Sequence, residues 1–104
     1  MISSDFRHIQ GAAFQGRLGI AKILYENGVP LRTLHSDSYE PIIRACWGND
    51  KRHTETVKFF LTHGVPLIEV FDKCMSTTNY RPTKQLLQKM MEEDMIEGDD
   101  GAEL

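Results

Sequence analysis

The feature that most constrains the fold of this chain is a four-residue repeat. Residues 28–31 and 64–67 both read Gly-Val-Pro-Leu, and the two copies lie 36 residues apart. An apolar stretch with helical spacing precedes each copy. Its members are Ile20, Ile23 and Leu24 in the first copy and Val57, Phe59, Phe60 and Leu61 in the second. Because glycine favours the left-handed conformation that ends a helix, and proline prevents the helix from continuing, the pattern predicts two helices that end alike.

A helix with smaller side chains is predicted before each of these two helices. Its apolar face holds Phe6, Ile9, Ala12 and Ala13 in the first copy and Pro41, Ile42, Ala45, Cys46 and Trp47 in the second. A third, degenerate copy follows, with a helix over 67–75, a break at 76–79 and a last helix opened by Pro82. The apolar residues of this copy are Leu67, Ile68, Val70, Phe71, Cys74 and Met75, then Leu86, Leu87, Met90 and Met91. We therefore expect an all-α fold of three helix pairs, at about 4–28, 38–64 and 67–91.

The middle copy resembles the ankyrin repeat, a unit of about 33 residues with a β-turn and two antiparallel helices. Asp37, Pro41, Ala45 and Gly64 stand at positions typical of that family, and the resemblance covers residues 5–91. The three additional residues of the 36-residue spacing fall in the turn at 49–53. The resemblance implies a helix-turn-helix solenoid with short β-turn fingers.

Three positions of the middle copy depart from the family pattern, and one of them is Ser38, which replaces the family's turn glycine. Glu40 and Ile43 replace the threonine and histidine of the family's Thr-Pro-Leu-His tetrad. Ser38 or Asp37 is therefore expected to cap the following helix instead.

The resemblance also implies a function, which is protein binding without catalysis. Ankyrin-type proteins bind partners with the concave face formed by the fingers and the inner helices. In this chain that face corresponds to Arg32, Leu34, His35, Ser38, Tyr39, Glu40 and Arg44. Trp47, at the end of an inner helix, has two interpretations: a lid over the core, or an anchor for a partner, since tryptophan and arginine dominate interface hot spots.

The chain contains histidines and cysteines that could bind a metal or take part in catalysis, but their spacing does not favour either role. His35, Cys46, His53, His63 and Cys74 show none of the short spacings that hold zinc, so neither a metal nor a cofactor is predicted. Cys46 with His53 or His63 could in principle form a nucleophile and base. In the repeat register, however, Cys46 replaces a buried alanine, which predicts an inert thiol and no enzyme.

The net charge of −3 hides an asymmetry between the body and the end of the chain. From Glu92 onward there are seven acids and no lysine or arginine, so the first 91 residues carry 12 bases against 8 acids, or about +4. We expect residues 1–91 to form the repeat domain and residues 92–104 a disordered acidic tail. The basic residues are dispersed, so nucleic acid is an unlikely partner. A small helical nucleic-acid-binding domain remains the alternative function, as does a fragment of a larger multidomain scaffold.

The remaining expectations concern compartment and association. No apolar run is long enough to span a bilayer, and no signal peptide is visible, so no membrane is expected. Two cysteines 28 residues apart suggest a reducing compartment, the cytoplasm or the nucleus. Exposed apolar side chains in the terminal repeats, at Phe6 and Ile9 or at Met90 and Met91, would favour self-association.

Overall fold

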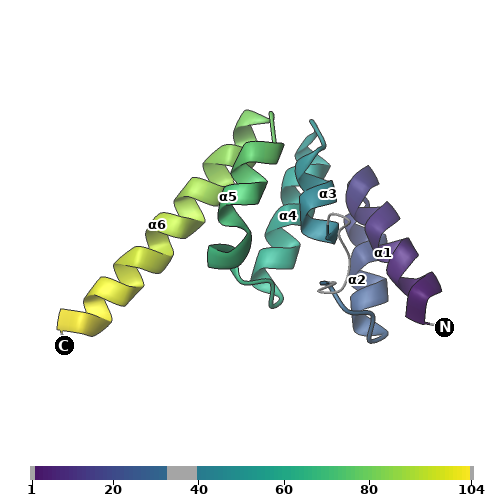
Figure 1. Cartoon of the computed structure of the whole chain (residues 1–104), viewed down its shortest axis with the longest axis horizontal. Helices are drawn as coiled ribbons and strands as arrows, with labels where there is room; N and C mark the ends of the chain where they lie inside the picture. Colours follow the sequence, from purple (N-terminus) through teal and green to yellow (C-terminus); the bar gives the residue numbers. More distant parts are fainter. Residues whose placement is uncertain (1, 33–39, 104) are drawn as a thin grey trace.

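Six helices make up the secondary structure of the described part of the chain (Figure 1). The computed structural model describes the backbone of residues 2–32 and 40–103, and the side chains of residues 7–32 and 40–94. The helices are α1 (Ile2–Gln15), α2 (Leu18–Glu26), α3 (Pro41–Cys46), α4 (Lys51–Thr62), α5 (Leu67–Thr77) and α6 (Arg81–Glu103). Residues 2–32 and 40–103 contain no strand, so the all-α prediction is confirmed for the described residues.

The helices pack in two layers of three. One layer is formed by α1, α3 and α5, where α3 contacts both of its neighbours, and the other by α2, α4 and α6, where α4 does the same. Across the layers, α1 packs against α2, α3 against α4 and α5 against α6. Figure 1 shows the six helices following one another along the molecule, with the N-terminus at one end and the C-terminus at the other. The longest dimension is 47 Å.

The two copies of Gly-Val-Pro-Leu close their helices in the same way. Gly28 and Gly64 have φ angles of 89° and 116°, in the left-handed region that favours glycine. The Val29 N–H donates to the Leu24 carbonyl oxygen at 3.0 Å, and the Val65 N–H donates to that of Phe60 at 3.1 Å. Each bond spans five residues, as in the Schellman motif, and satisfies a carbonyl that the helix end would leave open. The predicted helix ends are confirmed.

The core lies between the two layers and contains most of the predicted apolar positions. Ile9, Ala12 and Ala13 of α1 are buried, and so are Val57, Phe59 and Phe60 of α4. Small side chains on α1 and α3 allow these helices to approach each other closely. Pro41 opens α3 as predicted, and every residue of that helix except Arg44 is buried.

Three isoleucines differ from the sequence-based prediction. Ile20 and Ile23 of α2 are 44% and 59% exposed, and Ile68 of α5 is 78% exposed, whereas all three were expected on buried faces. Helix α2 instead turns Ala21 inward, and this residue is fully buried. Ile9 was expected to be exposed, but it is fully buried in the core and so offers no surface for self-association.

The last helix is longer than predicted. Helix α6 continues through residues 92–103, where a disordered tail was expected, and ends at Glu103. No proline follows Pro82, and the stretch from 83 to 97 is rich in strong helix formers such as leucine, methionine, glutamate and glutamine. The helix then continues through Gly98 and Gly101, although glycine lowers helix stability. Met90 and Met91 are half-buried on this helix. No helix of the described residues combines the length and the apolar character that crossing a membrane requires.

Candidate interaction surface

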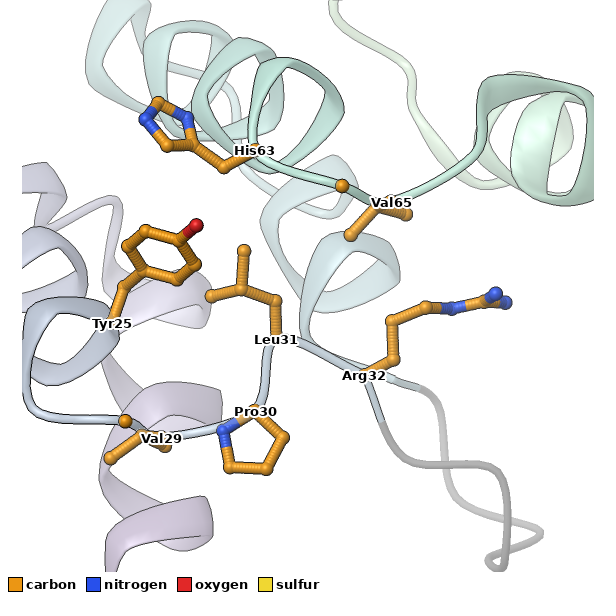
Figure 2. A pocket seen from close by; sticks show the side chains of 9 residues that line it. Tyr25, Val29, Pro30, Leu31, Arg32, His63 and Val65 are labelled. Carbon is orange, nitrogen blue, oxygen red and sulfur yellow. The ribbon is translucent and has the colours of Figure 1, made fainter.

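A shallow hollow of about 390 Å³ lies between the two Gly-Val-Pro-Leu loops. Figure 2 shows Leu31 pointing from the first loop toward the second, with Tyr25 on one side and Val65 on the other. Leu31 and Val65 are 7% and 2% exposed, so the loops bury their apolar side chains against each other. The hollow therefore lies at the contact between the two copies of the repeat, which we call the loop joint.

An aromatic cluster borders this joint. Tyr25 meets Phe59 and His63 edge to face, with ring centroids 5.8 Å and 5.2 Å apart, and the rings of Phe59 and His63 lie 4.2 Å apart. Nδ1 of His63 lies 2.8 Å from the Phe59 carbonyl oxygen. Because a carbonyl can only accept, Nδ1 carries the proton in this bond. The cluster joins the ends of α2 and α4 and fixes the imidazole of His63.

Arg32, a predicted partner contact, forms an intramolecular ion-pair network. Its guanidinium donates two hydrogen bonds to the Glu40 carboxylate, at 2.8 Å and 3.1 Å, and one to Glu69 at 2.8 Å. These hydrogen bonds raise the pKa of Arg32 further above its already high ordinary value. The network connects the first loop to the starts of α3 and α5, so Arg32 and Glu40 hold these segments together.

The start of α3 explains why Glu40 has this role. Glu40 occupies the N-cap position, but its side chain makes no capping hydrogen bond, because its carboxylate pairs with Arg32. The proposed caps Ser38 and Asp37 lie outside the described residues. The same holds for three further predicted contacts, Leu34, His35 and Tyr39.

The other two predicted contacts, Arg44 and Trp47, lie together at the opposite end of α3. The guanidinium carbon of Arg44 lies 5.4 Å from the centre of the Trp47 ring, and Trp47 meets Phe14 of α1 edge to face at 5.9 Å. Trp47 is 38% exposed and Phe14 is 50% exposed, so both reach solvent. We call Phe14, Arg44 and Trp47 the aromatic edge. A cation on an indole face beside an exposed phenyl ring is a combination that protein interfaces favour.

A buried histidine, His53, lies next to the aromatic edge and bonds to its backbone. This contact was not predicted from the sequence. Nε2 of His53 donates to the Phe14 carbonyl oxygen at 2.9 Å and thereby joins α4 to the end of α1. The ring fills the space beside Gly16 and Gly48, and a Cβ added at Gly48 would overlap it. The one sequence signal was the glycine before the turn at 49–53, which leaves room for a ring.

The two cysteines meet in the core. Cys46 of α3 and Cys74 of α5 are both fully buried, and neither forms a disulfide. A hydrogen bond with Cys74, together with burial, raises the pKa of the Cys46 thiol far above its ordinary value. Burial of Cys46 confirms the prediction from the repeat register, while its contact with Cys74 was not predicted.

No family model, curated protein or solved structure matches this chain. Among the side chains of residues 7–32 and 40–94, no three histidines, cysteines, aspartates or glutamates gather closely enough to hold a metal ion. The functional interpretation therefore depends on the aromatic edge, the loop joint and the charges at the two ends of the molecule.

Proposed function

We propose that this chain is an ankyrin-like solenoid of three helix pairs that binds a protein partner without catalysis. Two features support the solenoid: the two helix layers and the matching closure of α2 and α4. Stacking of similar units, each in contact with its neighbours, is how repeat proteins build a rigid binding surface from short helices.

The observation that carries the proposal is the aromatic edge. Trp47 and Phe14 remain exposed although the core beside them is well packed, and Arg44 lies on the indole. Rigid aromatic side chains supported by buried neighbours lose little conformational entropy when a partner covers them. The hydrogen bond from His53 to the Phe14 carbonyl oxygen holds the backbone that carries the Phe14 ring.

We assign two roles to the predicted contact residues. Trp47 and Arg44 act as anchors in our proposal, whereas Arg32 and Glu40 position the first loop through their ion pair. Leu34, His35, Ser38 and Tyr39 stay predicted contacts of the finger that precedes α3. Together these residues define a binding surface that runs along α3 from its start to the turn that follows it.

The absence of catalysis is supported by the state of the two thiols. Cys46 is buried, its thiol has a raised pKa, and it contacts Cys74 rather than a histidine base. We expect iodoacetamide to leave Cys46 unmodified in the folded protein and to modify it once the protein unfolds in denaturant. Rapid alkylation of the folded protein would instead favour a cysteine-dependent enzyme. The two unpaired thiols also support a cytoplasmic or nuclear location.

Photo-cross-linking tests the binding surface. A photoreactive phenylalanine replaces Trp47 in one variant and Ile68 in a matched control, since Ile68 is a large, more exposed side chain on α5. In native cells, we expect a discrete cross-linked protein from position 47 and none from position 68. Trp47→Ala should then weaken binding of the identified partner about 10- to 100-fold. Equal cross-linking from both positions, or none from position 47, would contradict the proposal.

A further inference from the structure

The end of the molecule formed by α1 and α2 carries a groove with a basic rim. This groove, of about 390 Å³, has Ala12, Ile20 and Leu24 among its apolar lining residues and Arg7, His8 and Arg17 among its polar ones. None of the described residues that line it is acidic. Arg7, Arg17 and Ile20 are all exposed. The groove therefore combines an apolar surface with excess positive charge.

The opposite end of the molecule carries the complementary charge. Helix α6 extends past the helices it packs against and reaches the far end of the chain (Figure 1). Residues 92–104 contain seven acids and no lysine or arginine, with Met95 and Ile96 as apolar residues among them. An extended acidic helix with apolar positions has the chemistry that an apolar groove with a basic rim would bind.

We propose that the α1/α2 groove binds the acidic end of α6 from a second copy of this chain. The groove and the acidic end lie at opposite ends of a molecule 47 Å long, so a chain cannot fill its own groove. Each copy then offers one groove and one acidic helix, and association runs head to tail. The α1/α2 groove contains no residue of the aromatic edge, so failure of the self-association proposal would leave the proposed partner binding unaffected.

The physical origin of the contact determines how it responds to salt. The Arg7 and Arg17 guanidinium groups are exposed, so their attraction to carboxylates is screened once the Debye length falls to a few ångströms. Burial of Ile20 and Leu24 adds a contribution that salt does not screen. We therefore expect weak association that depends on protein concentration and decreases strongly between about 50 mM and about 500 mM salt.

Sedimentation velocity on the full chain and two sets of variants tests this arrangement. The head variant, Arg7→Glu with Arg17→Glu, makes the groove acidic. The tail variant, Glu97→Gln with Asp99→Asn, Asp100→Asn and Glu103→Gln, removes charge from α6. Each variant alone should be monomeric at low salt, whereas the control Lys51→Glu with Lys58→Glu on α4 should associate like the unmodified chain. Circular dichroism checks folding, and Ile20→Glu serves as a second head variant.

Mixing the two variants distinguishes head-to-tail contact from any symmetric dimer. The head variant keeps a working acidic helix and the tail variant keeps a working groove, so the mixture should form a 1:1 complex that does not grow further. A monomeric unmodified chain at low salt would overturn the proposal. Association of either variant alone, or a mixture that stays monomeric, would overturn it as well.

Discussion

Helices α2 and α4 end in the same four residues, yet they bury very different sets of side chains. Of the nine residues of α2, Ala21 is the buried one, and Ile20 and Ile23 remain exposed. Helix α4 buries five of its twelve residues, and Phe60 among them is completely covered. Helix α4 lies between α2 and α6 in its layer, whereas α2 has α4 as its one neighbour there.

The difference shows what an apolar pattern can and cannot specify. Helical spacing of apolar residues predicts a helix in both places, and both helices form. Whether each apolar side chain is covered depends on how many neighbours the helix has, and that is a property of the whole stack. The exposed face of α2 is the open end of the row, and it is where we place the contact with a second copy.

The largest expected effect comes from core truncation in α4. Phe60→Ala removes a fully buried ring and leaves a cavity, so we expect a loss of about 3–5 kcal/mol in the free energy of unfolding. Ile23→Ala removes a side chain that is mostly in water, and should change that free energy by less than about 0.5 kcal/mol. Urea denaturation followed by circular dichroism measures both, and similar losses in the two variants would contradict the comparison.

The two glycines that end these helices should be equally sensitive. Alanine at position 28 or 64 must adopt a left-handed conformation, which costs an L-residue about 1–2 kcal/mol. A Cβ at either glycine meets no atom within 4 Å, so the cost arises from the backbone alone. Gly28→Ala and Gly64→Ala should therefore lower the free energy of unfolding by the same amount, as measured in urea. A clear inequality would show that the two closures differ.

The two copies differ at the residue that follows each loop. Arg32 follows the first loop and pairs with Glu40 and Glu69, while Ile68 stands 36 residues later and is exposed. We expect Arg32→Met to lower the free energy of unfolding by about 1 kcal/mol at low salt, and less at high salt, because the pairs are partly exposed. An effect that does not change with salt in urea denaturation would argue against the ion pairs.

The smallest effect is expected when the second copy is made to match the first. Ile68→Arg replaces a side chain that is 78% exposed, so the free energy of unfolding should change by less than about 0.5 kcal/mol. Thermal or urea unfolding provides the measurement. A decrease of more than about 1 kcal/mol in the free energy of unfolding would mean that Ile68 is buried in solution, and it would contradict the comparison of the two copies.

The sequence predicted features that depend on neighbouring residues along the chain. The helix ends at Gly28 and Gly64, the start of α3 at Pro41 and the burial of Cys46 all follow from local rules or from the repeat register. Contacts between distant residues were not predictable in this way. The bond between His53 and the Phe14 carbonyl joins residues 39 apart, and that between Arg32 and Glu69 joins residues 37 apart.

The candidate site was predicted in part for the same reason. Arg44 and Trp47 lie three residues apart, in α3 and at its C-cap, so their proximity follows from helix geometry. The length of α6 was not predicted, because the acids of residues 92–104 indicated a disordered tail, whereas the helix continues through them to Glu103 and includes Gly98 and Gly101.

Native-state hydrogen exchange by NMR tests most directly whether α2 is the open end of a stack and α4 its centre. Because α4 is packed on both sides, its amides should exchange mainly through global unfolding, with the largest opening free energies in the chain. The amides of α2 should open at a lower free energy, since that helix can separate from one neighbour while the rest stays folded. Equal or greater protection of α2 would contradict this account.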